Sequence, residues 1–285
     1  VPAGRYVLAA SATLARRWHD HQFGNVLEHD RHDTAFAEAT LRGSHGEHTW
    51  VGGVAVEQDA YHPTELPRFG YTFTTPGVFV QDDIDIRPWL AMSTSARLDH
   101  HSKYGWFFSP RVSALLRSSN WSTRMSVGSG FFGPSPLTDE TEAAGLTRLV
   151  VDGPLRAERG RSVSIDLTRT YGPLSSTATF FGSRVTDPVQ VDRSTYVLRN
   201  LAKPTTNVGI ELLGVVRQAP LAITASYTYV RSREHVEAVT HDVELTPRHS
   251  VGVVTMVENE DGRLGLEVYY TGRQRLEDNP YRGTS

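Results

Sequence analysis

The 285-residue sequence contains no cysteine, no long apolar run and no strong excess of charge of either sign. The absence of cysteine excludes disulfides, thiolate metal sites and cysteine nucleophiles. With 29 Lys and Arg against 32 Asp and Glu, and neither end strongly basic, nucleic acid is not an expected partner. No run approaches the roughly 18 apolar residues that a membrane helix needs. A membrane strand needs only about 9–11 residues, alternate ones facing lipid, so this composition still allows a membrane protein built from strands.

The two ends of the chain do not look like natural boundaries. The first residues, Val1 to Gly4, show no signal-peptide pattern and lead almost at once into a strand-like segment. The last residues, Gly283 to Ser285, close a polar stretch. The expectation is therefore that residues 1–285 are one partial domain of a longer protein.

A period of two residues dominates the chain. Residues 90–99, 121–130, 161–167 and 263–270 each place apolar side chains on one face and small or charged ones on the other. This alternation is typical of half-buried strands. Asp82 is an exception, because it falls on the apolar face of its segment. The pattern predicts about thirteen strands, at residues 5–18, 31–43, 47–60, 77–87, 89–100, 106–118, 121–131, 156–170, 174–186, 195–216, 220–232, 246–258 and 262–273.

The connections between these segments alternate between tight and long. Tight turns are expected at 43–46, 87–88, 117–120, 171–173, 217–220 and 259–262, and the other connections at 19–30, 61–76, 101–105, 132–155, 187–194 and 233–245. Apart from 101–105, the second set is long. Outer-membrane barrels have short periplasmic turns and long external loops. We therefore expect 19–30 and 132–155 to lie at the same end. The one convincing helix lies at 137–146, with Asp139 and Glu142 at capping-box spacing and Gly145 to end it.

The fold class that follows is all-β, an antiparallel transmembrane β-barrel of up-and-down meander topology. A soluble β-sandwich also alternates, but soluble strands cluster near 5–6 residues. Aromatic residues near the expected strand ends suit the girdles that flank a membrane. These are Trp18, Trp89, Tyr104, Trp106, Trp121, Tyr196, Tyr227, Tyr229, Tyr269 and Tyr270.

Motifs for cofactor or metal chemistry are weak. Residues 128–133 fit a dinucleotide fingerprint by letter, but prolines follow where a helix should open, so a strand entering a loop is the better interpretation. The cluster His19, Asp20, His21, His29, Asp30, His32 and Asp33, with the later pair His100 and His101, offers imidazole and carboxylate groups that could bind zinc or nickel. Its spacings match no known ligand pattern, so we expect a hydrated loop and no metal site.

Catalytic motifs are equally weak. Asp83 and Asp85 share a face but lack the calcium-loop spacing. No Gly-x-Ser-x-Gly elbow is present, although a triad assembled in space stays open. The expectation is a protein without catalytic residues or a cofactor, hence not an enzyme.

An ordered series of segments resembles the TonB-dependent receptors. Residues 76–83 resemble their G-x-F-x-Q-D strand, 95–99 their R-x-D strand and 109–113 their s-P-R-v strand. Residues 128–134 resemble the entry into a loop, and Asn200, 209–211, 227–229, 247–249 and 270–272 fit the later strands in family order.

The resemblance implies an outer-membrane barrel of about 22 strands, closed by an N-terminal plug absent from this chain. It implies import of a scarce ligand such as a ferric siderophore or cobalamin. The TonB complex would supply energy through the plug and a TonB box. Outer-membrane lipid would surround the barrel.

Five charged residues on the polar strand faces are candidates for lumen-facing contacts with a ligand or a plug: Arg97, Arg111, Arg124, Glu211 and Glu267. For the arginines, salt bridges within the lumen are the simpler interpretation, and attraction of an anionic ligand the functional one. The competing functions are a passive porin, an outer-membrane enzyme and a soluble β-protein. Upstream plug sequence would separate receptor from porin, and membrane fractionation would test the soluble alternative.

Overall fold

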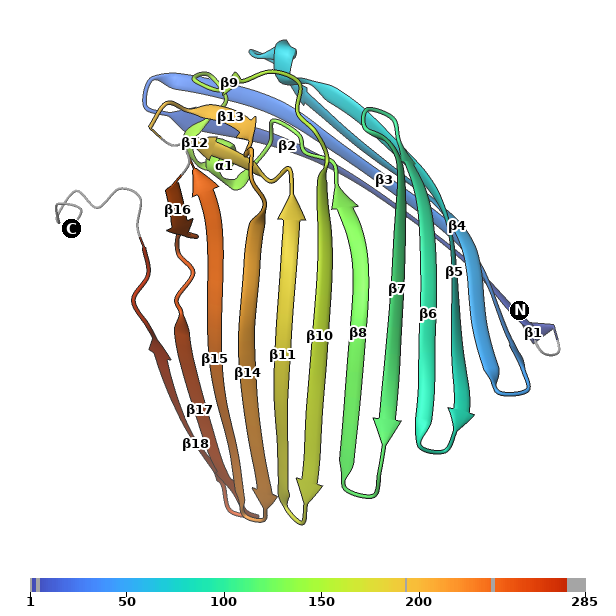
Figure 1. Cartoon of the computed structure of the whole chain (residues 1–285). Coiled ribbons are helices and arrows are strands. Elements are labelled where there is room, and N and C mark those ends of the chain that lie inside the picture. Colours follow the sequence, from blue (N-terminus) through green and yellow to red (C-terminus); the bar gives the residue numbers. More distant parts are fainter. Residues whose placement is uncertain (1, 4–5, 193, 237–238, 276–285) are drawn as a thin grey trace.

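A single curved antiparallel sheet makes up most of the molecule in the computed structural model, which describes residues 2–3, 6–192, 194–236 and 239–275 (Figure 1). The sheet has 15 strands, and along its main path each strand pairs with the next in the chain. Its strands are β1 (Pro2–Ala3), β2 (Tyr6–Phe23), β3 (Val26–His45), β4 (His48–Pro63), β5 (Tyr71–Arg87), β6 (Leu90–His101), β7 (Gly105–Arg117), β8 (Trp121–Phe132), β10 (Glu158–Tyr171), β11 (Leu174–Thr186), β14 (Thr205–Gln218), β15 (Leu221–Val236), β16 (Val239–Asp242), β17 (His249–Glu258) and β18 (Arg263–Thr271).

The predicted meander is confirmed. Among the described residues, thirteen strands remain when the two-residue β1 and the four-residue β16 are set aside. The sheet does not close on itself in the described part of the chain, since no pairing joins β18 to the β1–β2 edge. We call the end with the tight turns the turn end and the opposite end the loop end.

Three predicted loops, 19–30, 61–76 and 233–245, are wrong, because strands occupy most of them; in the last, β15 runs to Val236 and β16 covers Val239–Asp242. β2 and β3 run on through 19–30 and pair from Tyr6↔Gly43 to Phe23↔Val26, with a turn at Gly24, whose φ is +62°. β4 reaches Pro63, and a short 3₁₀ helix at Pro67–Phe69 precedes β5, which begins at Tyr71. Alternation failed as a signal at 19–30 because both faces of these ends of β2 and β3 are polar.

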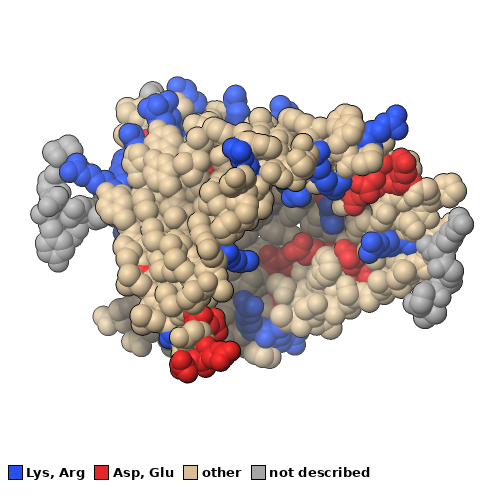
Figure 2. All heavy atoms as spheres, turned by 90° about the horizontal axis from the view of Figure 1, so that it is seen from below, with Lys and Arg blue, Asp and Glu red and all other residues tan. Residues whose placement is uncertain are grey.

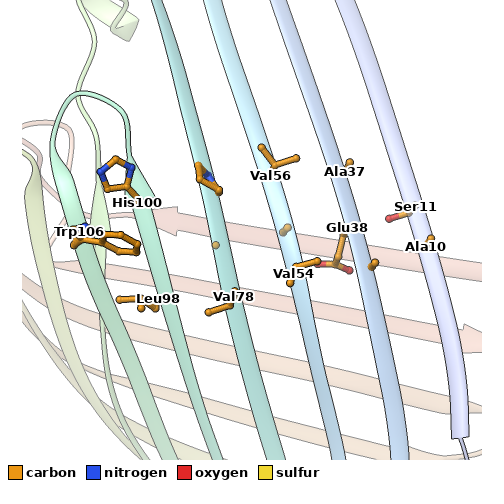
Figure 3. A pocket seen from close by; sticks show the side chains of 14 residues that line it. Ala10, Ser11, Ala37, Glu38, Val54, Val56, Val78, Leu98, His100 and Trp106 are labelled. Carbon is orange, nitrogen blue, oxygen red and sulfur yellow. The ribbon is translucent and has the colours of Figure 1, made fainter.

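The two faces of the sheet differ in polarity. The outer face carries exposed apolar side chains such as Leu14, Val127 and Val163, which are 83%, 56% and 52% exposed. Figure 3 shows a shallow apolar depression of about 690 Å³ on this face, lined by small and branched side chains that include Ala10, Val56 and Val78. Viewed from below, acidic and basic residues gather inside the hollow of the sheet (Figure 2). Such a sheet suits an apolar surrounding outside and water inside.

Asp82, the exception in the sequence pattern, does lie on the outer face. Its neighbour in register on β4 is Trp50, and its carboxylate lies 2.8 Å from Nδ1 of His48, near the turn end. His48 on the neighbouring strand therefore partners one carboxylate oxygen, Oδ2, whereas Oδ1 is buried and has no hydrogen-bond partner among the described residues.

The aromatic residues divide into two groups. Trp18, Trp106 and Trp121 are exposed by 69%, 65% and 49%, as girdle residues would be. Tyr196 was wrongly assigned to this group, because it is only 7% exposed and packs in the cap described next. The Tyr104 hydroxyl donates to the carbonyl of Pro134 at 2.6 Å and so also serves the cap.

A cap covers part of the loop end. It is formed by residues 133–157, with α1 (Asp139–Ala144) and β9 (Val150–Val151), and by residues 187–192 and 194–204, with β12 (Val189–Asp192) and β13 (Val197–Asn200). β12, β13 and β9 form a separate three-stranded sheet in which β9 and β13 are parallel. The strand predicted at 195–216 is therefore two strands in different sheets. Pro204, which has no N–H to donate, directly precedes β14.

The cap has its own hydrophobic core, seated on the barrel wall. Leu146, Leu149, Leu155, Val191, Tyr196 and Leu198 cluster with Tyr61 of β4 and Phe69. The helix, Asp139–Ala144, is shorter than the predicted 137–146, and its N-cap lies one residue before the predicted one. Thr138 and Thr141 form the capping box in place of Asp139 and Glu142, and Gly145 (φ +84°) ends the helix as expected. No helix in the described residues is long and apolar enough to cross a membrane.

Candidate functional site

An imidazole and aromatic belt lines the inner face at the loop end. It consists of His32, Tyr61, Tyr71, Phe73 and His101, which come from β3, β4, β5 and β6. Register places His32 opposite Tyr61 and Tyr61 opposite Tyr71. Each ring touches the next, with centroids 5.9 Å, 5.8 Å, 4.5 Å and 4.9 Å apart along the row. Because Tyr61, Phe73 and His101 are at most 9% exposed, this belt supports the cap and leaves little ring surface for a ligand.

Two carboxylates, those of Asp59 and Asp30, form hydrogen bonds with polar atoms of the belt. Asp59 lies 2.5 Å from Nε2 of His32 and accepts from the hydroxyl of Tyr71 at 3.3 Å. Asp30 is buried and accepts from the hydroxyl of Tyr61 at 3.2 Å. A buried carboxylate needs such partners to offset its desolvation.

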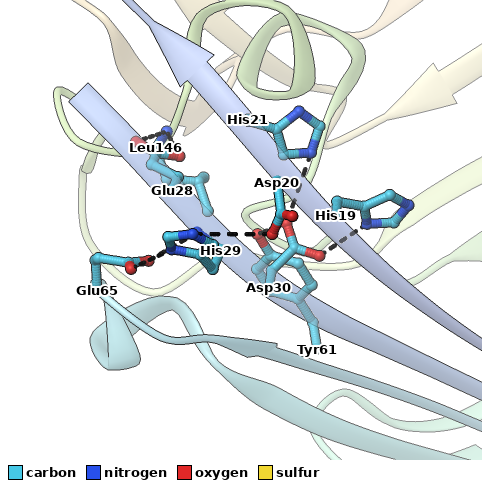
Figure 4. Close-up of polar contacts among 9 residues, drawn as sticks. All are labelled: His19, Asp20, His21, Glu28, His29, Asp30, Tyr61, Glu65 and Leu146. Carbon is cyan, nitrogen blue, oxygen red and sulfur yellow. Dashed lines mark hydrogen bonds and ion pairs between the residues drawn. The ribbon is translucent and has the colours of Figure 1, made fainter. Parts of the chain in front are cut away.

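Two histidines share Asp30 with Tyr61 (Figure 4). Nδ1 of His19 lies 2.8 Å from one carboxylate oxygen, and Nε2 of His21 lies 3.7 Å from the other. His19 and His21 are two residues apart on β2, so their side chains point to the same face, and register places His19 directly opposite Asp30. We call His19, His21 and Asp30 the histidine–aspartate trio.

A second polar region, the arginine cavity, lies nearer the turn end. Its volume is about 700 Å³, and its charged lining consists of Asp83, Asp85, Arg111, Arg117, Arg124 and Asp166. Arg117 pairs with Asp85 at 3.5 Å. Among the described residues, Arg111 and Arg124 have no ion pair. Their guanidinium groups are thus free to bind carboxylate or phosphate groups of another molecule.

The five predicted contact residues all lie on the inner face, but the structure does not bring them to one place. Arg111 and Arg124 line the arginine cavity, whereas Arg97 lies nearer the loop end and donates through Nε to Asp99 at 2.8 Å and 2.9 Å. Glu211 follows Arg124 in a continuous cross-strand row through Asp166 and Thr179. Glu267 lies apart on β18, where it accepts from the hydroxyl of Tyr269 at 3.1 Å.

Register gives a physical reason for two of the sequence motifs. Gly77 lies opposite Asp99, and Phe79 lies opposite Arg97 on the neighbouring strand. The Arg97 guanidinium stacks over the Phe79 ring at 5.7 Å while it pairs with Asp99. The side-chain atoms of this pair occupy the space where a Cβ on residue 77 would lie, so any other residue there would displace Arg97 or Asp99. Two motifs about 20 residues apart thus form one interlocked unit.

The family model for the "TonB dependent receptor-like, beta-barrel" domain matches residues 4–284. The chain belongs to this family. The TonB-dependent receptors are a family of receptors and transporters, and the resemblance seen in the sequence is confirmed. A search of curated proteins finds no match.

Solved structures show the same fold at low sequence identity. The FrpB iron transporter from Neisseria meningitidis (F5-1 variant) matches with a TM-score of 0.77 and 14% identity, over 94% of this chain and 49% of that one. The siderophore receptor PirA from Pseudomonas aeruginosa matches with 0.65 and 13%, over 93% and 56%. The alcaligin outer-membrane receptor FauA from Bordetella pertussis matches with 0.69 and 14%, over 94% and 51%. The chain thus spans about half the length of these TonB-dependent receptors.

Sequence reasoning missed the groups that fasten the cap and treated the trio as part of a loop. Glu28 contacts the cap but resembled any polar residue near a turn. The trio did leave a signal, because a His-x-His pair places both rings on one face if the segment is a strand. The fingerprint at 128–133, as expected, is the end of β8 and its exit, with no helix opening there.

Proposed function

We propose that this chain forms part of the wall of an outer-membrane TonB-dependent receptor in bacteria, which imports a scarce ligand such as a ferric siderophore or cobalamin. The observation that carries the proposal is the one-sided sheet, apolar outside and charged inside, with an ordered cap fixed to its inner wall at the loop end. A passive pore needs the two faces but not a cap with its own hydrophobic core. Family membership supports the same conclusion.

In this proposal the loop end faces the outside of the cell and the turn end faces the periplasm. Long external loops and short periplasmic turns are the rule for outer-membrane barrels. The ligand would enter beside the cap, and the arginine cavity would lie deeper along the passage. The TonB complex would supply energy through a plug domain and a TonB box, neither of which is part of these residues.

The contact residues take different roles in this proposal. Arg111 and Arg124 would bind anionic groups of the ligand or carboxylates of the plug, because both guanidinium groups lack an ion pair in the described wall. Glu211, in the same cross-strand row as Arg124, would bind basic groups. Glu267 would do the same on β18. Arg97, already paired with Asp99, would mainly hold the wall together.

Uptake measured in cells tests the proposal. A strain lacking the gene is complemented with the full-length protein and given iron-55 on a panel of siderophores, or cobalt-57 cobalamin. The expected result is saturable uptake of one ligand class that disappears in a strain without TonB. Uptake that rises linearly with concentration and persists without TonB would establish the porin instead. Saturable uptake that does not need TonB would also overturn the receptor proposal.

A further inference from the structure

The histidine–aspartate trio has the composition and the spacing of a metal site. The three ligand atoms, one from each side chain, all lie within 4.8 Å of one another. We propose that His19, His21 and Asp30 bind a divalent first-row transition-metal ion, with Zn²⁺ and Ni²⁺ as the ions to test first. Two imidazoles and a carboxylate suit these ions, whereas Mg²⁺ and Ca²⁺ prefer all-oxygen sites. The site does not depend on the proposed transport function.

The sequence argued against a metal because the ligand spacings match no known pattern, and a hydrated loop was expected here. In the structure the two histidines lie on β2 and the aspartate on β3, and the hairpin pairing continues past all three. Ordered strands fix the directions of the three side chains, so little conformational entropy is lost when an ion binds. The ligand spacing is therefore a cross-strand pattern and does not follow the spacings known for metal sites in loops or helices.

The surroundings of the trio hold its ligands in place. Asp30 is nearly inaccessible, with a side chain 5% exposed, and the Tyr61 hydroxyl donates to it. The ring of His21 stacks on Phe23, with centroids 5.8 Å apart. Outer contacts of this kind orient metal ligands, and their loss typically costs about 10–100-fold in metal affinity.

The two imidazoles remain accessible from the solvent. The side chains of His19 and His21 are 39% and 37% exposed, so an ion can reach them. Three protein ligands leave a fourth position of a tetrahedral ion open. At the loop end that position would accept water or a donor atom of an arriving molecule.

Metal titration of the full-length protein in detergent, prepared without a histidine tag and stripped with a chelator, tests the site. The expected result is one tight Zn²⁺ or Ni²⁺ per chain that excess Ca²⁺ does not displace. Cobalt should report the same site through its visible absorption. His21→Gln should weaken binding at least about tenfold, and Tyr61→Phe, which keeps the ring but loses the hydroxyl, by about tenfold.

His48→Gln is the matched control. His48 also lies 2.8 Å from a carboxylate, that of Asp82, but among the described residues no third ligating group completes a cluster with this pair. Its loss should leave metal affinity unchanged. The proposal is overturned if the stripped protein binds no transition metal with a defined stoichiometry. It is also overturned if His21→Gln and His48→Gln bind equally well while both variants show the heat-modifiable migration of a folded barrel.

Discussion

Glu28 on β3 accepts hydrogen bonds from the backbone N–H of Leu146 at 2.9 Å and 3.0 Å, although the two residues are 118 positions apart in the chain. The same carboxylate accepts from the N–H and the hydroxyl of Thr147. This contact confirms that 19–30 and 132–155 lie at the same end. This buried side chain on β3 thus ties the cap to a part of the wall other than the strands that directly precede and follow the cap residues in the chain.

Glu28→Ala should release the cap without unfolding the sheet. The change leaves the buried N–H of Leu146 without an acceptor, at a cost of about 1–3 kcal/mol, and also removes the acceptor of the more exposed Thr147. Hydrogen exchange should accelerate in peptides covering 137–152, and proteases should cut there sooner. Glu57→Ala, at an exposed position of β4 where no hydrogen bond is recorded, is the control. Equal exchange in both variants would show that Glu28 does not hold the cap.

Gly77→Ala should destabilise the wall itself. A methyl group at this position would meet Nη2 of Arg97 at 2.9 Å and Cγ of Asp99 at 3.2 Å, and would separate a pair whose carboxylate is buried. Overpacking of this kind costs roughly 1–3 kcal/mol. The urea midpoint, followed by tryptophan fluorescence, should fall accordingly. Gly160→Ala has open space around the added methyl and should leave the midpoint almost unchanged.

Arg111→Gln and Arg124→Gln should reduce ligand uptake while the barrel stays folded. Both side chains are exposed in the arginine cavity and have no ion pair to lose within the described wall. The loss should be larger at low ionic strength, because salt screens the attraction between exposed charges. Initial uptake rates at two salt concentrations measure it. Arg169→Gln, which removes a guanidinium stacked over Trp121 on the outer face, should leave the rates unchanged.

Acid should loosen the β12–β13 hairpin of the cap through Asp192. The hydroxyl of Ser194 and the N–H groups of Thr195 and Ser194 donate to its carboxylate and hold its pKa below the ordinary value of 3.8. A depressed pKa stabilises the fold at pH values above that ordinary value. The stabilisation fades below pH 3.8 and is gone once the pH falls through the lowered pKa.

Hydrogen exchange of peptides covering 189–200, measured across this pH range, checks the prediction. Asp192→Asn should make the hairpin exchange rapidly at every pH. Asp152→Asn, at an exposed cap position with no recorded side-chain partner, should keep the pH dependence of the unchanged protein. A hairpin that keeps the same protection above and below the transition would contradict the role given to Asp192.

Whether a strand could be predicted from the sequence depends on whether its two faces differ in polarity. The strands were visible in the sequence wherever apolar positions of the outer face, such as Val127 and Val163, alternate with serines. At the loop end both faces of β2 and β3 are polar, so the alternation disappeared and 19–30 resembled a loop.

The cap was invisible for a different reason. Leu146 and Leu149 are buried in irregular segments, and Leu198 in a strand of only four residues, so there is no period long enough to detect. The contact face of Arg111 and Arg124 followed from alternation alone, whereas the contacts of Arg97 and Asp99 with Phe79 and Gly77 required the register between β5 and β6.

The connectivity of the wall also dictates an order of assembly. Long strands that pair only with their neighbours in the sheet can be added one after another, and wherever a tight turn joins two of them the step closes a short loop at little entropic cost. The cap cannot form in this way, because its core needs Tyr61, residues 146–155 and residues 191–198 together. We therefore expect the cap to close late, because its contacts join residues far apart in the chain. A cap protected from hydrogen exchange would then indicate that strands β4 to β14 are already in register.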